Sequence, residues 1–245
     1  MSQPNISVII NAHREGLLAV ASLRSLAQAK MIAEQQGLSV ETIAVLDRCD
    51  EITADVFEER TYLDCEILRV DNGDLGRSRN NGVTHTRGEW IAFLDADDLW
   101  GENWLAEAFI SANSDNRMVV WHPEANLYFG VVQHIFRHVD MDDLEFDPLN
   151  LIFKNYWTAL SFTRKTTVID IPYPVTDLSR GIGYEDWSWN QEVIARGGIH
   201  KVVRGTAHAI RARNHSLLRT TAAGASIPYP TDMYRNMLIE RSRAA

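Results

Sequence analysis

The chain has 245 residues, a length that fits one compact α/β domain better than two. Hydrophobic residues make up 45% of it and charged residues 23%, the balance of a globular protein that buries a full core. The formal net charge of −9 argues against nucleic-acid binding, which normally requires a basic face. We therefore expect no nucleic-acid partner.

The cysteines and the first residues of the chain indicate which cellular compartment the protein occupies. Cys49 and Cys65 are too few for a disulfide framework and do not have the spacing of zinc ligands. Residues 1–5 lack the basic start and apolar stretch of a signal peptide. No run of about 18 apolar residues occurs, so we expect no transmembrane segment. These features favour a cytoplasmic protein and leave peripheral contact with the inner face of the membrane open.

The first hundred residues alternate between short apolar runs and helical patterns. Residues 6–10 are a β-branched apolar run typical of a buried parallel strand, and residues 16–36 carry apolar side chains at helical spacing. The alternation continues with strands expected at 40–46, 65–70 and 90–94, and helices at 50–60 and 76–87. This β-α-β-α-β-α-β order predicts a parallel sheet covered by helices.

Polar residues follow each of these strands directly. Ligands of such sheets bind at the carboxyl ends of the strands. We therefore expect the ligand site among Asn11, Asp47, Asp71–Asn72 and Asp95–Asp98.

The second half of the chain is less regular and contains neither repeats nor low-complexity linkers. The expected elements are a helix at 103–113, a strand at 118–121, an apolar stretch at 127–132, an acidic loop at 140–148, a helix at 184–196, a strand at 199–203 and a terminal helix at 231–241. We expect it to belong to the same domain as the first half.

Three carboxylates within four residues follow the fourth strand: Asp95, Asp97 and Asp98. Hard divalent cations such as Mg²⁺ and Mn²⁺ prefer oxygen ligands, and diphosphate oxygens can complete their shell. The alternative is that this acidic cluster only caps the next helix, because acidic side chains favour helix N-termini.

Two stretches around the acidic cluster follow a recognisable pattern. Residues 71–82 read DNGDLGRSRNNG and residues 87–98 read RGEWIAFLDADD. They resemble glycosyltransferase family 2, in which an R-N-x-G stretch precedes G-E-x-I-x-F-L-D-x-D-D. Ser78 stands where that family usually has alanine. The resemblance covers about residues 5–110 well and the remainder loosely.

The resemblance implies a GT-A, Rossmann-like α/β fold with a mixed, mainly parallel sheet flanked by helices. It implies one domain over residues 1–245, in which about 1–115 bind a nucleotide-diphospho-sugar and about 116–245 form the acceptor-binding half and C-terminal tail. The activity implied is inverting sugar transfer to an acceptor hydroxyl, assisted by Mn²⁺ or Mg²⁺. The acceptor implied is a glycan or lipid-linked glycan, in bacterial surface polysaccharide or lipopolysaccharide synthesis.

By this resemblance the donor site includes the ends of the first two strands. Asn11 is expected near the nucleobase, although His13–Arg14 replace the usual Tyr-Asn. Asp47 is the candidate acceptor for a nucleobase N–H, with capping of the helix that begins at Asp50 as the alternative.

Arg79 is expected to reach the nucleobase or the diphosphate, because a guanidinium suits planar or oxyanionic partners; its alternative is an ordinary surface arginine. Asp95 is expected to bind the ribose or assist the metal, and Asp97 to be the direct metal ligand. Asp98 is expected only to cap the next helix.

Residues 183–187, GYEDW, resemble the family's E-D motif at the start of a helix. Its aspartate generally acts as the base, so Asp186 is the expected general base and Glu185 its catalytic neighbour or acceptor contact. The alternative is helix capping.

Residues 204–219 are rich in arginine and histidine and contain no acidic residue. This basic segment, with Arg211 as its candidate contact, is expected to clamp the donor diphosphate when a flexible segment closes. His208 or His215 is the candidate to complete the metal shell. The alternative is a solvated loop.

Two other functions compete with sugar transfer. A nucleotidyltransferase that makes sugar nucleotides usually has a G-x-G-x-R loop and a lysine after the first strand, and neither occurs here. A non-catalytic glycan- or nucleotide-sugar-binding module would not need to retain both Asp97 and Asp186.

Overall fold

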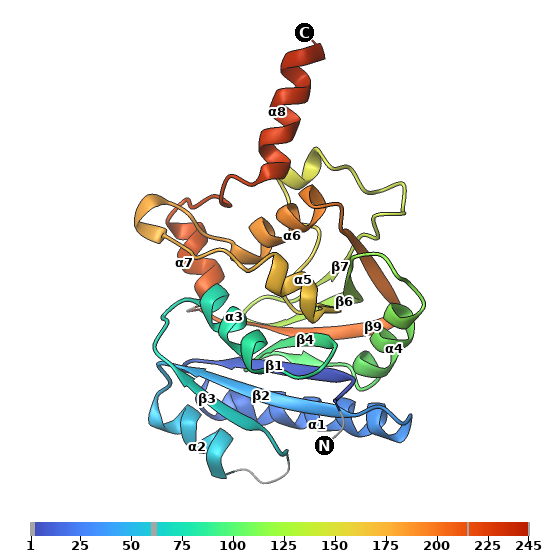
Figure 1. Ribbon diagram of the computed structural model, residues 1–245. Coiled ribbons are helices and arrows are strands. Elements are labelled where there is room, and N and C mark those ends of the chain that lie inside the picture. The colour runs from blue at the N-terminus through green and yellow to red at the C-terminus, as the bar shows by residue number, and fades with distance from the viewer. Residues whose placement is uncertain (1–2, 60–62, 215, 245) are drawn as a thin grey trace.

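The computed structural model describes residues 3–59, 63–214 and 216–244 (Figure 1). Its strands are β1 (Ile6–Ala12), β2 (Val40–Asp47), β3 (Glu66–Val70), β4 (Trp90–Asp95), β5 (Leu99–Trp100), β6 (Val119–Gly130), β7 (His134–Arg137), β8 (Phe162–Arg164) and β9 (Ile199–Ala212). Its helices are α1 (Ala19–Gln35), α2 (Glu51–Glu59), α3 (Leu75–His85), α4 (Trp104–Asn113), α5 (Lys165–Asp170), α6 (Glu185–Ala195), α7 (Leu217–Ala223) and α8 (Asp232–Ala244). Short 3-10 turns are η1 (Gly16–Leu18), η2 (Asn150–Ile152) and η3 (Leu178–Arg180).

The strands of the described residues join in one mixed sheet with the order β3-β2-β1-β4-β8-β6-β9-β5, and β7 pairs with β6. Strands β1 to β4 are parallel to their neighbours within this group, as their helical crossovers require. Antiparallel β8 then joins β4 to β6. The expected α/β fold with a mixed sheet flanked by helices is confirmed.

Helices cover both faces of the sheet, with α1 and α2 on one side and α3, α5 and α6 on the other (Figure 1). Successive side chains of a strand point to opposite faces, so β1 supplies both cores. Ile6, Val8 and Ile10 pack in the cluster that contains α1 and α4, whereas Ile9 packs with Val83 of α3 on the opposite face. A strand that is buried on both faces needs apolar residues on both, which explains the run at residues 6–10; its one polar residue, Ser7, donates its hydroxyl to Glu41.

The second half departs most from the expected elements. The strand expected at 118–121 continues to Gly130 as β6, and the strand expected at 199–203 continues to Ala212 as β9. The two pair in parallel over this length, with a register shift between Pro123 and Ala125. Much of the basic segment is therefore strand rather than solvated loop, because its backbone groups pair with β6.

A cluster of buried histidines, which the sequence patterns did not predict, fills the space between this pair of strands and α6. His122 Nε2 lies 2.9 Å from His200 Nδ1, and His138 Nδ1 lies 2.6 Å from the carbonyl oxygen of Pro123. Trp157 stacks on His200 at 4.1 Å between ring centroids. Burial lowers the pKa of His138 to about 4 and that of His200 to about 3. Both rings are therefore neutral near pH 7.

In the part of the chain that the structure describes, no helix has the length and apolar character needed to cross a membrane. Helix α8 projects from the body beside α6 (Figure 1). Cys49 and Cys65 are free thiols.

Replacement of His138 by Asn is expected to weaken the acid sensitivity of folding. The unfolded chain binds a proton at His138 near its ordinary pKa of 6.5, whereas the folded chain binds it only near 4, so stability falls as the pH drops through this window. Between pH 7 and pH 5, the free energy of unfolding of the wild type should fall by about 2 kcal/mol more than that of His138→Asn. Urea titrations measure this difference.

The matched control is His85→Asn, at an exposed position on α3. It should retain the wild-type pH dependence. Equal pH dependence of the wild type and His138→Asn would contradict the assignment of a neutral buried ring.

Candidate functional site

The carboxyl ends of β1 and β4 place Asn11 beside Asp95, because these two residues are partners in the parallel register. The Asn11 side chain is 5% exposed, and neither its Nδ2 nor its Oδ1 has a hydrogen-bond partner among the described residues. A buried amide without partners is costly. This edge of the sheet therefore presents polar atoms that a bound ligand could satisfy.

Arg79 is the buried centre of the site. Its Nη1 donates to Glu185 Oε1 at 2.8 Å, and its Nη2 donates to both carboxylate oxygens of Asp95 at 3.2 and 3.3 Å. The side chain is 1% exposed, and its guanidinium carbon lies 5.3 Å from the centroid of the Tyr173 ring. The alternative of a surface arginine is wrong. Arg79 binds two carboxylates of its own chain and so joins the acidic cluster to the E-D motif.

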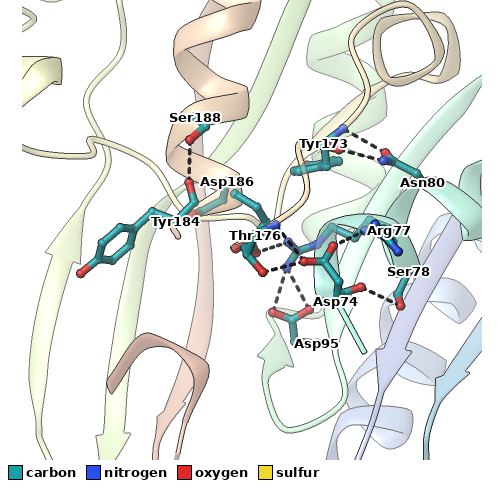
Figure 2. A network of polar contacts seen from close by, with 12 residues as sticks. Asp74, Arg77, Ser78, Asn80, Asp95, Tyr173, Thr176, Tyr184, Asp186 and Ser188 are labelled. Atoms are coloured by element: carbon teal, nitrogen blue, oxygen red, sulfur yellow. Dashed lines mark hydrogen bonds and ion pairs between the residues drawn. The ribbon is translucent and has the colours of Figure 1, made fainter. Parts of the chain in front are cut away.

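The position of Arg79 follows from how α3 is held (Figure 2). Asp74 caps the helix by accepting from the backbone N–H of Arg77 at 2.8 Å, and it also accepts from the backbone N–H of Thr176 at 2.9 Å. Asn80 exchanges two hydrogen bonds with the backbone of Tyr173, at 2.9 and 3.0 Å. The segment before α6 is thus tied to α3.

Asp47 accepts hydrogen bonds from its own chain, and its expected contact with a nucleobase stays a prediction. Its Oδ1 accepts from the backbone N–H groups of Asn72 and Gly73 at 2.9 and 3.0 Å, and its Oδ2 accepts from the Ser78 hydroxyl at 2.9 Å. The capping alternative is wrong, because Asp50 itself accepts from the N–H of Thr53. Asp47 fixes the turn into α3, and Ser78 supplies a bond that alanine could not.

The acidic cluster is partly buried and does not cap α4, which begins only at Trp104. The Asp97 side chain is 13% exposed, and burial raises its pKa to about 6. Asp98 is 6% exposed and accepts from the backbone N–H of Arg211 at 2.7 Å. Burial and the neighbouring charges of Asp97 and Asp95 raise the pKa of Asp98 well above its ordinary value. The cluster is therefore crowded with negative charge.

The end of β9 lies against this cluster. Arg211 Nε donates to the carbonyl oxygen of Asp97 at 3.2 Å, and its guanidinium carbon lies 4.5 Å from the centroid of the Phe129 ring. Arg213 Nε lies 2.8 Å from Asp97 Oδ2, and the same side chain reaches Glu15 at 3.8 Å. Within the basic segment the sequence singled out Arg211, whereas Arg213, which directly follows β9, makes the ion pair with Asp97.

The structure does not bring His208 to the carboxylates. His208 is 1% exposed and packs in the core, with its ring centroid 4.7 Å from that of Trp104 and 6.1 Å from that of Trp100. His215 lies outside the described residues. Within the described part of the chain, no three His, Cys, Asp or Glu side chains gather as a preformed metal centre. Asp97 and Asp95 remain the oxygen donors suited to a hard cation.

Glu185 and Asp186 are the first two residues of α6, and the residue at the N-cap position, Tyr184, makes no side-chain hydrogen bond to the helix. Tyr184 precedes them in the left-handed conformation, with φ of 56°, which is unusual for a residue other than glycine. Burial and the adjacent charge of Glu185 raise the pKa of Asp186 to about 7. Asp186 can therefore take up and release a proton near neutral pH.

Removal of Arg79 should cost far more stability than removal of a surface arginine. Arg79→Met leaves Glu185 and Asp95 facing each other without their cation, so it should lower the free energy of unfolding by about 3–5 kcal/mol. Arg235→Met is the control, because its pair with Asp232 is about half exposed and should contribute less than about 1 kcal/mol. Urea unfolding measures both, and equal losses would contradict the central role of Arg79.

The chain is similar to known proteins in sequence and in fold. A Bacillus subtilis (strain 168) protein described as a glycosyltransferase, EpsH, is 26% identical over 122 residues, which is 49% of this chain and 34% of that protein. The chain thus spans about a third of the length of this curated relative.

Solved structures share the fold. Staphylococcus aureus TarS superposes with a TM-score of 0.64 at 20% identity, over 85% of this chain and 37% of TarS. TarS 1–349 in complex with UDP-GlcNAc gives 0.64 at 19% identity, over 94% of this chain and 64% of the other. The mannosyltransferase PcManGT from Pyrobaculum calidifontis, in complex with GDP-Man and Mn²⁺, gives 0.60 at 14% identity, over 88% of this chain and 59% of the other.

The expected GT-A fold is thereby confirmed. The sequence profile of glycosyl transferase family 2 matches residues 7–167, which include β1 to β4, the acidic cluster and Arg79. Because this match covers well over half of the chain, the chain belongs to glycosyl transferase family 2.

Proposed function

We propose that the protein is an inverting glycosyltransferase that moves a sugar from a nucleotide-diphospho-sugar to an acceptor hydroxyl. The observation that supports this proposal best is the bridge made by Arg79. One guanidinium binds Asp95 of the acidic cluster and Glu185 of the E-D motif, so the donor-binding carboxylates and the candidate base lie at one site.

The donor would bind at the carboxyl ends of β1 and β4. Asp97 and Asp95 would hold Mn²⁺ or Mg²⁺, which would neutralise charge on the departing diphosphate. Asn11, with its unpartnered buried amide, would contact the nucleotide. Arg211 and Arg213 lie beside Asp97, and from there their guanidinium groups would contact the donor diphosphate. The complexes of TarS with UDP-GlcNAc and of PcManGT with GDP-Man and Mn²⁺ support this class of donor.

Asp186 would be the general base. Its carboxylate accepts the proton of the acceptor hydroxyl while that oxygen forms a bond to the anomeric carbon. The bond from this carbon to the diphosphate oxygen breaks at the same time, and attack opposite the leaving group inverts the anomeric centre. A base with a pKa of about 7 is deprotonated in a substantial fraction of molecules at neutral pH and is still basic enough to accept the hydroxyl proton.

The acceptor class and the setting of the reaction rest on the family resemblance. The acceptor would be a glycan or lipid-linked glycan of bacterial surface polysaccharide or lipopolysaccharide synthesis. The reaction would take place in the cytoplasm, at the inner face of the membrane where the acceptor is anchored.

Asp97→Ala should abolish metal-dependent donor binding. Calorimetric titration with UDP and GDP should show tighter binding in the presence of Mn²⁺ for the wild type and no effect of Mn²⁺ for the variant, because the direct ligand is gone. Asp55→Ala, at an exposed position on α2, is the control. Unchanged Mn²⁺-dependent affinity in Asp97→Ala would remove the metal assignment.

Asp186→Asn should bind nucleotide as the wild type does and lose turnover. An amide cannot accept the proton, so turnover should fall by about two to four orders of magnitude. The readout is nucleotide diphosphate released from UDP-GlcNAc or GDP-mannose, together with the dissociation constant for UDP or GDP. Full turnover by this variant would place the base elsewhere, and absence of turnover in the wild type with either donor would favour the alternative of a binding module.

A further inference from the structure

A side chain outside both sequence motifs contacts the candidate base. Asn155 lies in the loop that follows η2, and its Nδ2 donates to Asp186 Oδ2 at 3.4 Å. Its Oδ1 accepts from Asn190 Nδ2 at 3.2 Å and from the backbone N–H of Trp157 at 3.3 Å. Asn190 lies one helical turn beyond Asp186 on α6 and is 1% exposed. Asn155 therefore bridges two residues on the same face of α6.

The network defines which end of the Asn155 amide faces the base. A carboxylate accepts hydrogen bonds, whereas the N–H groups of Asn190 and Trp157 donate them. The amide oxygen must therefore face the two donors and the amide nitrogen must face Asp186. The opposite orientation would set the amide oxygen against the carboxylate and leave these donors without an acceptor.

The loop that carries Asn155 is held firmly against α6. Leu151 offers its carbonyl oxygen to Trp187 Nε1 at 2.7 Å and to Gln191 Nε2 at 3.0 Å. Trp157 is 1% exposed and donates from Nε1 to the carbonyl oxygen of Val139 at 2.7 Å. Anchors on both sides of Asn155 leave its side chain little freedom, as positioning of a reactive group requires.

The other titratable groups that act on Asp186 come from α3, α6, β4, β6 and the segment before α6. Glu185 is its neighbour on α6, Arg79 lies on α3, and Asp95 lies at the end of β4. Tyr128 of β6 and Tyr173 of the segment before α6 also interact electrostatically with it. Of these charged neighbours Arg79 alone favours the ionised carboxylate, and Arg79 is already shared between Glu185 and Asp95. A neutral donor such as Asn155 adds support for the ionised form without adding charge.

We propose that Asn155 is a positioning residue for the Asp186 base: its amide binds Oδ2 and, together with the backbone N–H of Trp187, fixes the plane of the carboxylate that receives the hydroxyl proton of the acceptor. This inference rests on the proposed function, because Asp186 must be the base for it to matter in turnover. The inference assigns a role to the loop after η2, which lies outside both sequence motifs.

The direct test is the ionisation of Asp186 itself. The midpoint of the Asp186 carboxyl ¹³C chemical shift is followed by NMR against pH, with Asp186→Asn to identify the signal. In Asn155→Ala, loss of a donor to the ionised form should raise this midpoint by about one pH unit. Asn150→Ala, at an exposed position of η2 in the same loop, should leave it unchanged. An unshifted midpoint in Asn155→Ala overturns the inference.

The second test is turnover, measured as nucleotide diphosphate released from UDP-GlcNAc or GDP-mannose. Asn155→Ala should reduce kcat about tenfold, as expected for a hydrogen bond to a charged group, with the dissociation constant for UDP or GDP unchanged. The acidic limb of its pH profile should move to higher pH. In the Asp186→Asn background the same change should have no further effect, because Asn155 acts through Asp186.

The outcomes separate the two proposals. If Asp186→Asn loses turnover but Asn155→Ala has the wild-type pH profile and lowers kcat equally in both backgrounds, Asn155 has a structural role only and the proposed function stands. If Asp186→Asn keeps full turnover, the assignment of the base falls and this inference falls with it. Asn155→Asp, an isostere that keeps the Oδ1 acceptor, is the second variant should Asn155→Ala fail to fold. It should raise the Asp186 midpoint by like-charge repulsion, and an unshifted midpoint in it also overturns the inference.

Discussion

The ion triad of Arg79 with Asp95 and Glu185 is the constraint on which the site depends. Burial of a guanidinium is costly unless opposite charges and hydrogen bonds compensate it, and the two carboxylates do so at 2.8 to 3.3 Å. Such a triad is weak evidence for stability, since a well-packed apolar set can fill the same volume at similar free energy. The triad does constrain the geometry of the site, because α3, β4 and α6 must keep one arrangement for all these hydrogen bonds to form.

The triad also leaves the site rich in negative charge. The pKa values of Asp97, Asp98 and Asp186 are all raised by burial and by neighbouring carboxylates, among which Asp95 acts on all three. Arg213 pairs with Asp97 and also acts electrostatically on Asp98. A site in which carboxylates outnumber arginines favours cations and protons. Both are what the proposed transfer requires, a divalent cation at Asp97 and a proton at Asp186.

Local patterns predicted the first half of the fold well, because β1 to β4 and α1 to α3 follow from apolar runs and helical spacing in consecutive segments. They also pointed to the acidic cluster and the E-D motif. The contact between Arg79 and Glu185 joins residues 106 positions apart, and no local pattern contains that information. The lengths of β6 and β9 were missed for a similar reason. The outer parts of β6 and β9 carry polar and basic residues. They form strands because their backbones pair with each other, which local apolar content does not predict.

The two predicted halves are not independent units. Ile9 of β1 and Ile43 of β2 pack in the same apolar cluster as Trp189 and Val193 of α6, so the face of the sheet that supports the acidic cluster also supports the helix that begins with Glu185 and Asp186. Residues 1–115 alone would expose that apolar face and leave Arg79 with one of its two partners. The contact that joins the acidic cluster to Glu185 through Arg79 can form only when the second half is folded onto the first, so one shared apolar core brings the two motifs together.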